Sequence, residues 1–271
     1  MSEEVTIETQ ALTRRFGDAT VVNRLTLQVS AGEVFGLLGP NGAGKSTVVK
    51  MLTTLLPPSA GSARVVGYDI VRQATQVRRM IGYVPQALSA DGELTAYENL
   101  LIFARLYDLP REIRHARINE ALDFMGLAES SHKLVRTYSG GMIRRLEIAL
   151  ATLHYPQVLF LDEPTVGLDP LARSAVWEHL ERLRQERNTT IFMTTHYMEE
   201  AQEQCGRVAI MDRGVARVVG APQALIAALS QPGATLDDVF TRYAREEQES
   251  QESSGEYRET ERTRRITSRL S

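Results

Sequence analysis

The chain has 271 residues, of which 43% are hydrophobic and 24% are charged, as in globular proteins that form one large domain or two small ones. A formal net charge of -3 argues against the strongly basic surface of a nucleic-acid-binding protein. Because Cys205 is the only cysteine, no internal disulfide can form, which suits a reducing cytoplasm. The N-terminus is acidic, and no apolar run approaches the roughly 20 residues of a membrane span, so we expect neither a signal peptide nor a transmembrane segment.

Two segments near the N-terminus, residues 5–9 and 25–29, alternate apolar and polar side chains. This period of two predicts half-exposed antiparallel strands. Between them we expect a turn over Arg14–Asp18 with Phe16 at its mouth. The Phe16 ring could stack on a nucleotide base, although packing on the sheet is the simpler interpretation.

The segment GPNGAGKST follows the P-loop pattern of Gly, four residues, and Gly-Lys-Ser/Thr. An apolar run over Glu33–Leu38 predicts a buried strand before it, and a helix should follow from Thr47 to Leu56. Glycines let the backbone N–H groups turn inward around an anion, and the helix N-terminus favours phosphate. The residues assigned to this phosphate site are Gly39, Asn41, Gly42, Ala43, Gly44, Lys45, Ser46 and Thr47.

The next elements are short strands at residues 63–66 and 81–84, the second ended by Pro85 and Gln86. Gln86 is an ordinary loop residue unless a nucleotide is near, in which case its amide could contact Mg²⁺ or the attacking water. Residues 94–125 have a helical pattern that Pro110 breaks, and Thr95 and Glu98 resemble a capping box.

Two further segments carry candidate site residues. Ser139, Gly140 and Gly141 precede a helix predicted over residues 143–153, where they could form a phosphate-binding turn or an ordinary N-cap. Four apolar residues, 158–161, predict a buried strand that ends in Asp162 and Glu163. Two carboxylates at the carboxyl end of a buried strand need a nearby cation, and Mg²⁺ fits the P-loop context.

The remaining elements follow in order. Pro170 should begin a helix that runs to about Arg187, and it carries the lone tryptophan, Trp177, as a core residue. A strand over residues 189–195 ends at His196, which is either a structural residue or a contact for a terminal phosphate. A helix (199–205), a hairpin (207–211 and 215–219) and two short helices (222–229 and 236–244) should complete the fold. The charged stretch 245–265 is expected to be disordered.

The motifs occur in the order of an ATP-binding-cassette (ABC) nucleotide-binding domain, which the chain resembles over roughly residues 5–243. Tyr138–Met142, followed by Arg-Arg-Leu-Glu, is similar to the daunorubicin-resistance type of ATPase, which partners export permeases of the ABC-2 class. Residues 236–240 are also similar to that group. Phe16 departs from the tyrosine that many members carry.

The resemblance implies a role for each matching position. Phe16 would stack on adenine, Lys45 would contact the β- and γ-phosphates, and Ser46, Gln86 and Asp162 would serve Mg²⁺. Glu163 would be the general base, and His196 would contact the γ-phosphate. Ser139, Gly140, Gly141 and Asp169 would lie at the contact with a second copy and serve its ATP.

We therefore expect an α/β fold: a P-loop NTPase core with a RecA-like mixed sheet, an antiparallel β subdomain and a helical subdomain. The expected boundaries are a core of residues 1–87 and 151–220, a helical subdomain of 88–150, C-terminal helices at 221–243 and a tail at 244–271. The resemblance implies a peripheral ATPase, requiring ATP and Mg²⁺, at the cytoplasmic face of the cell membrane. It would form a homodimer on an ABC-2 permease and drive efflux of a small hydrophobic compound.

The alternative is a soluble ABC ATPase with a non-membrane partner. Fewer than about 100 residues separate Lys45 from Ser139, without sustained heptads, which argues against a coiled-coil repair ATPase. An importer subunit stays open on the residues alone, as does the cargo: a drug, a lipid-linked glycan, an antibiotic or a peptide.

Overall fold

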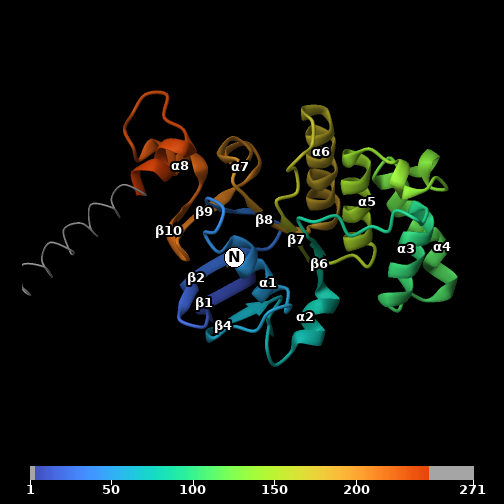
Figure 1. Cartoon of the computed structure of the whole chain (residues 1–271), viewed down its shortest axis with the longest axis horizontal. Helices are drawn as coiled ribbons and strands as arrows, with labels where there is room; N and C mark the ends of the chain where they lie inside the picture. The colour runs from blue at the N-terminus through green and yellow to red at the C-terminus, as the bar shows by residue number, and fades with distance from the viewer. Residues whose placement is uncertain (1–3, 244–271) are drawn as a thin grey trace, which may run out of the picture.

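The strands form two sheets, one mixed and one antiparallel (Figure 1). The computed structural model describes residues 4–243, so the charged tail expected at 244–271 lies outside the described residues. The six-stranded mixed sheet has the order β10-β9-β3-β8-β7-β6. Its strands are β3 (Val34–Leu38), β6 (Ile81–Val84), β7 (Val158–Asp162), β8 (Thr190–Thr195), β9 (Arg207–Asp212) and β10 (Val215–Gly220).

All neighbours in this sheet are parallel except the β9–β10 hairpin. The register pairs Asp162 with Thr194 and Leu38 with Thr195, so β3, β7 and β8 end side by side. The residues that follow these strands therefore gather at one edge of the sheet, where α/β proteins bind their ligands.

The antiparallel sheet has the order β2-β1-β4-β5, with β1 at Val5–Phe16, β2 at Ala19–Ser30, β4 at Ala60–Val65 and β5 at Tyr68–Asp69. Strands β1 and β2 are 12 residues long, longer than the predicted five-residue strands. Register shifts on either side of Leu12 interrupt the alternation of apolar and polar residues. The sequence pattern therefore predicted only part of each strand. The turn is consequently shorter than predicted, and Phe16 is the last residue of β1 rather than a loop residue.

Helix α1 (Lys45–Leu52) begins two residues before and ends four residues before the predicted bounds. The Thr53 hydroxyl bonds the Val49 carbonyl at 2.8 Å, and Thr54 has a left-handed φ of 64°, so the helix stops before Pro57. The short helix α2 (Ala74–Met80) was not predicted, because Val77 is its only buried residue.

Three helices lie together beyond β6 (Figure 1): α3 (Ala96–Leu106), α4 (Arg111–Phe124) and α5 (Gly140–Thr152). The predicted capping box is present, since Thr95 accepts from the Glu98 amide and Glu98 accepts from the Thr95 amide. Helix α5 begins at Gly140 rather than at residue 143. Short 3₁₀ turns at Ala128–Ser130 and Val135–Thr137 connect α4 to α5.

The later helices follow the prediction closely. Helix α6 spans Pro170–Arg187 as expected, α7 spans Met198–Gln204, and α8 spans Pro222–Ala227. Residues 236–243 are helical up to the last described residue. Among residues 4–243, no helix is both long enough and apolar enough to cross a lipid bilayer.

The mixed sheet separates two hydrophobic cores, because alternate residues of each strand face opposite sides. Val34 and Leu38 of β3 face the core that holds α5, α6 and Trp177, which is buried as predicted. Phe35 and Leu37 face the core between the two sheets, which α1 fills.

Cys205 packs at the sheet against Gly36 of β3. A Cβ on Gly36 would lie 2.8 Å from the Cys205 Sγ, so glycine is required at this close approach. The thiol is buried, with 6% of the residue exposed, and burial raises the pKa of Cys205 well above its usual range.

His154 follows α5, and its ring stacks on Tyr107 with centroids 3.8 Å apart. Its Nε2 lies 3.0 Å from the Ile81 carbonyl oxygen, while its buried Nδ1 has no hydrogen-bond partner among the described residues. Burial lowers the pKa of His154 from 6.5 to about 4. The folded chain therefore keeps this ring neutral at pH values where the unfolded chain protonates it.

We expect the free energy of unfolding to fall as the pH drops from 6.5 towards 4, by up to roughly 1.4 kcal/mol per pH unit from this one group. His154→Gln retains a donor for the Ile81 carbonyl but cannot titrate, so its pH dependence should be shallower than that of the wild type. Urea unfolding at pH 7, 6 and 5 measures the difference. Equal slopes for His154→Gln and wild type would mean that His154 titrates normally in the fold.

Candidate active site

The P-loop turns tightly between β3 and α1, and two of its glycines are sterically required. A Cβ on Gly39 would lie 2.1 Å from the Met211 carbonyl oxygen, and one on Gly44 would lie 2.6 Å from the Val21 carbonyl oxygen. Gly44 also has a left-handed φ of 100°. Gly42 (φ 83°) faces open space, with no atom within 4 Å of the position of a Cβ. The loop thus leaves the space beside the Gly42 backbone open.

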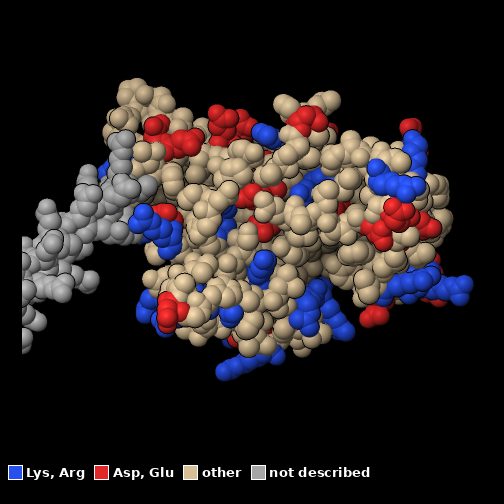
Figure 2. All heavy atoms as spheres, in the orientation of Figure 1, with Lys and Arg blue, Asp and Glu red and all other residues tan. Residues whose placement is uncertain are grey.

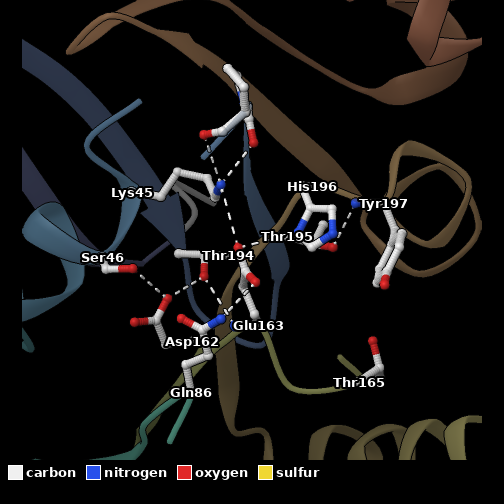
Figure 3. A network of polar contacts seen from close by, with 12 residues as sticks. Lys45, Ser46, Gln86, Asp162, Glu163, Thr165, Thr194, Thr195, His196 and Tyr197 are labelled. Atoms are coloured by element: carbon white, nitrogen blue, oxygen red, sulfur yellow. Dashed lines mark hydrogen bonds and ion pairs between the residues drawn. The ribbon is translucent and has the colours of Figure 1, made fainter. Parts of the chain in front are cut away.

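Lys45 is the first residue of α1, and only 5% of it is exposed. Its Nζ donates to the carbonyl oxygens of Gly39 at 2.7 Å and Pro40 at 3.2 Å, and lies 3.5 Å from Glu163 Oε1 (Figure 3). The loop therefore fixes a buried positive charge directly opposite the carboxylate that follows β7.

Asp162, the last residue of β7, is 3% exposed. Its Oδ1 accepts from the Ser46 hydroxyl at 3.0 Å and from the Thr194 hydroxyl at 2.6 Å. Burial, together with the Asp162 charge, raises the pKa of Tyr83 to about 12, so this phenol on β6 stays neutral. Thr194 was not predicted as a site residue, because its sequence context indicates only a β-branched strand former.

Glu163 has a left-handed backbone conformation (φ 51°), which is strained for a residue with a Cβ. Its amide donates to both the carbonyl and the hydroxyl oxygen of Thr194, each at 3.1 Å. Its carboxylate accepts from Gln86 Nε2 at 3.2 Å, and His196 Nδ1 lies 3.3 Å away. Figure 3 shows the side chains of Gln86, Lys45 and His196 around this carboxylate.

These contacts bring together the six predicted residues Lys45, Ser46, Gln86, Asp162, Glu163 and His196. They come from α1 and from the carboxyl ends of β6, β7 and β8. Beside them lies a cavity of about 370 Å³, lined by Val21, Pro40, Asn41, Gly42, Ala43, Gly44, Lys45, Ser46, Thr47, Gln86 and Glu163. All of the predicted P-loop residues except Gly39 line it.

Phe16 does not line this cavity. It is 47% exposed at the end of β1, and the Arg14 guanidinium lies 4.5 Å from its ring centroid. Val21, which follows the start of β2, lines the cavity instead. The sequence offered no signal for Val21, because it reads as an ordinary strand residue.

Ser139, Gly140, Gly141 and Asp169 also lie outside the cavity, at a second surface. The Ser139 hydroxyl caps α5, and the Asp169 carboxylate caps α6 by accepting from the Ala172 amide at 2.9 Å. A Cβ on Gly141 would lie 2.7 Å from the Cβ of Ala172, so the starts of these two helices touch. Gly140 and Ser139 are exposed there.

The oxygen atoms beside the P-loop suit Mg²⁺. In the described part of the chain, no three His, Cys, Asp or Glu side chains gather into a metal site. Mg²⁺, however, usually takes only one or two carboxylates and completes its shell with waters and substrate phosphates. The Ser46 hydroxyl and the Asp162 carboxylate, 3.0 Å apart, fit that need.

Charges of both signs occur on the face seen in Figure 2. Lys and Arg side chains lie over α2 and the outer end of α4, whereas Asp and Glu side chains lie near α7 and α8. This mixture agrees with a net charge of -3.

A P-loop opposite an Asp-Glu pair at the carboxyl edge of a parallel sheet defines a P-loop NTPase. A family model described as ABC transporter matches residues 22–166, and the chain belongs to this family. ATPases of this family bind and hydrolyse ATP.

Two relatives illustrate the similarity. The chain is 44% identical over 220 residues to the Nod factor export ATP-binding protein I of Burkholderia lata, covering 81% of this chain and 72% of that protein. It is 44% identical over 208 residues to the daunorubicin/doxorubicin resistance ATP-binding protein DrrA of Streptomyces peucetius, covering 77% of this chain and 63% of DrrA. The resemblance to the daunorubicin-resistance type is thereby confirmed.

Solved structures agree on the fold. An ATP-binding subunit of an ABC transporter superposes with a TM-score of 0.78 at 28% identity, covering 88% of this chain and 99% of that one. The cbiO1 protein of Clostridium perfringens, described as part of the transporter complex cbiONQ, gives a TM-score of 0.76 at 28% identity, covering 83% and 92%.

Proposed function

We propose that the protein is the ATP-hydrolysing subunit of an ABC-2 type membrane exporter that expels a small hydrophobic compound such as a drug or antibiotic. The main support for this proposal is that Lys45, Asp162 and Glu163 lie close together beside the P-loop cavity. The names of the relatives, which refer to export of Nod factors and to daunorubicin resistance, support export as the work that hydrolysis drives.

In this proposal, the chain's own residues arrange one displacement at the γ-phosphorus of ATP. Lys45 would neutralise the β- and γ-phosphate oxygens, and Ser46, Asp162 and Gln86 would hold Mg²⁺, which would supply further charge stabilisation. Glu163 accepts the proton of the attacking water as the bond to the ADP oxygen breaks.

His196 completes this arrangement in the proposal by contacting the γ-phosphate. Its Nδ1 lies 3.3 Å from Glu163 Oε1, so the ring can also orient that carboxylate.

The second surface suggests how two copies cooperate. Ser139, Gly140, Gly141 and Asp169 would meet the ATP bound to a second copy, and Phe16 would stack on the adenine of its own ATP. Ser139 and Gly140 are exposed at the start of α5, where the helix N-terminus favours phosphate, which supports this arrangement. ATP would then hold a homodimer together, and hydrolysis would release it.

The permease is proposed to bind near Gln86, at the cytoplasmic face of the cell membrane. Within the proposed helical subdomain of residues 88–150, Leu88 is 58% exposed and suits such a contact. Leu94 and Tyr97 in the same subdomain are half-buried, and the Tyr97 hydroxyl lies 3.0 Å from His115 Nδ1. We also propose that the rest of the chain divides into a core of residues 1–87 and 151–220 and C-terminal helices at residues 221–243.

The test is affinity purification of tagged Glu163→Gln from detergent-solubilised membranes of its natural host, with ATP and Mg²⁺. We expect a stoichiometric, multi-span protein of the ABC-2 class, and Leu88→Asp in the same background should lose it while still binding ATP. A soluble dimer without any membrane protein would overturn the exporter proposal and favour the soluble ATPase alternative.

A further inference from the structure

Helix α5 carries a buried pair of opposite charges in the middle of the protein. Arg144 is 3% exposed and Glu147 is 2% exposed, and Arg144 Nη1 lies 3.1 Å from Glu147 Oε2, one turn along the helix. The pair lies beside the hydrophobic core that α5 shares with α6. Its two charges need contacts beyond the pair itself to offset the cost of removing them from water.

Those contacts all go to the segment that follows β6. Arg144 Nη1 donates to the Pro85 carbonyl oxygen at 2.8 Å, and its Nη2 donates to the Gln86 carbonyl oxygen at 3.2 Å. Glu147 Oε1 accepts from the amide of Ser89 at 2.5 Å and from its hydroxyl at 3.1 Å. Residues 85–89 belong to no helix or strand, so these four hydrogen bonds attach an irregular segment to a rigid helix.

The attached segment reaches the candidate active site, because the Gln86 side chain donates to Glu163. The same helix begins at Gly140, four residues before Arg144 or roughly 6 Å along the helix axis at 1.5 Å per residue. Over such a short distance a helix moves as one body. Any displacement of the start of α5 therefore carries the backbone of residues 85–89 with it.

We infer that Arg144 and Glu147 are positioning residues that make the location of Gln86 depend on the location of the α5 N-terminus. This inference rests on the proposed function, in which that N-terminus meets the ATP of a second copy. Contact between the copies at Ser139–Gly141 would then set Gln86 against Glu163 in the chain's own site. The two ATP sites would communicate through one helix.

The energetics favour this role over a purely structural one. Replacing a buried ion pair by apolar side chains of similar volume is often neutral or stabilising. An apolar pair, however, cannot pair with the carbonyl oxygens of Pro85 and Gln86 or with the Ser89 amide. The two charged side chains therefore stabilise the position of the attached segment more than they stabilise the hydrophobic core.

The test uses the full chain with Arg144→Met and Glu147→Met together. We expect it to fold with an unfolding midpoint close to that of the wild type. Hydrogen exchange of the amides at residues 86–89, followed by mass spectrometry, should accelerate at least tenfold, because the Ser89 amide loses its hydrogen bond to the Glu147 carboxylate and the segment loses its attachment to α5. The kcat for ATP hydrolysis should fall about tenfold, with KM for ATP within about twofold, since the P-loop is untouched.

The matched control is Arg145→Met on the same helix. Arg145 is half-buried, and its guanidinium donates to the Met125 carbonyl at 2.8 Å, away from the 85–89 segment. Exchange at residues 86–89 should stay at the wild-type rate in this variant.

A double-mutant cycle with Gln86→Ala separates positioning from general destabilisation. If Arg144 and Glu147 act through Gln86, adding their Met substitutions to Gln86→Ala should lower kcat no further. Unchanged exchange at 86–89, or effects on kcat that multiply independently, would overturn the inference. If the paired Met variant does not fold, Arg144→Lys undergoes the same measurements, because it keeps the charge but lacks the planar, forked donor geometry of the guanidinium that contacts both carbonyls. A wild-type protein without ATPase activity would refute the proposed function, whereas the exchange result would still test the attachment.

Discussion

Replacing Glu163 by Gln is expected to slow ATP hydrolysis by a factor of about 10²–10⁴ while ATP still binds, because a positioned general base typically contributes this much. Gln has nearly the same shape as Glu, and its amide oxygen can still accept a hydrogen bond from Lys45 or Gln86. It cannot accept a proton from water. Single-turnover phosphate release measures the chemical step, and equilibrium titration with a fluorescent ATP analogue measures binding.

The matched control for this change is Glu178→Gln, an exposed carboxylate on α6. Its hydrolysis rate should equal that of the wild type. Glu163→Gln should also form a more persistent dimer in ATP, since hydrolysis would no longer release the second copy. Hydrolysis by Glu163→Gln at the wild-type rate would remove Glu163 from the role of general base.

Lys45→Ala is expected to weaken ATP binding by about 10- to 100-fold. Hydrogen bonds to charged groups contribute roughly 1.5–3 kcal/mol, and each 1.4 kcal/mol changes the dissociation constant tenfold. The ammonium lies buried in the P-loop between two carbonyl oxygens and the Glu163 carboxylate, so no neighbouring cation can take its place without rebuilding the loop. Isothermal titration with a non-hydrolysable ATP analogue and Mg²⁺ measures the change.

Lys50→Ala provides the control, because Lys50 belongs to the same helix but is exposed. Its dissociation constant should lie within about twofold of the wild-type value. A Lys45→Ala protein with wild-type affinity would mean that phosphate binds elsewhere.

The best-predicted elements are those that begin and end at residues which favour a helix or strand boundary, such as proline or a left-handed asparagine. Pro170 at the first turn and Asn188, with a left-handed φ of 51° after the last turn, fix both ends of α6. By contrast, α2 buries one residue and presents no apolar stripe to detect. The lengths of β1 and β2 were underestimated, because bulges interrupt the alternation on which strand prediction depends.

The site residues likewise divide into those with a recognisable sequence signal and those without one. Lys45, Asp162, Glu163 and His196 were predicted because charged or titratable side chains directly follow buried strands or a glycine-rich turn. Thr194 was missed because threonine is common in strands.

The buried hydrogen-bond network around Glu200, which includes Thr195 at the end of β8, was also not predicted. The Glu200 carboxylate accepts from the Thr165 hydroxyl at 2.6 Å, from Trp177 Nε1 at 2.8 Å and from the Thr195 hydroxyl at 3.2 Å. Its partners come from three separate stretches of chain, and only tertiary packing brings them together.

The buried Cys205 has a practical consequence for spectroscopy. Thiol-reactive dyes attack the thiolate, and burial suppresses both access to Cys205 and its ionisation. Because no other cysteine occurs in the chain, the wild-type sequence already serves as a nearly silent background for labelling. One cysteine introduced at an exposed position, such as Leu106 at the end of α3, would accept a single fluorophore. Energy transfer between two labelled copies would then measure whether they approach and separate during turnover, as the proposed dimerisation requires.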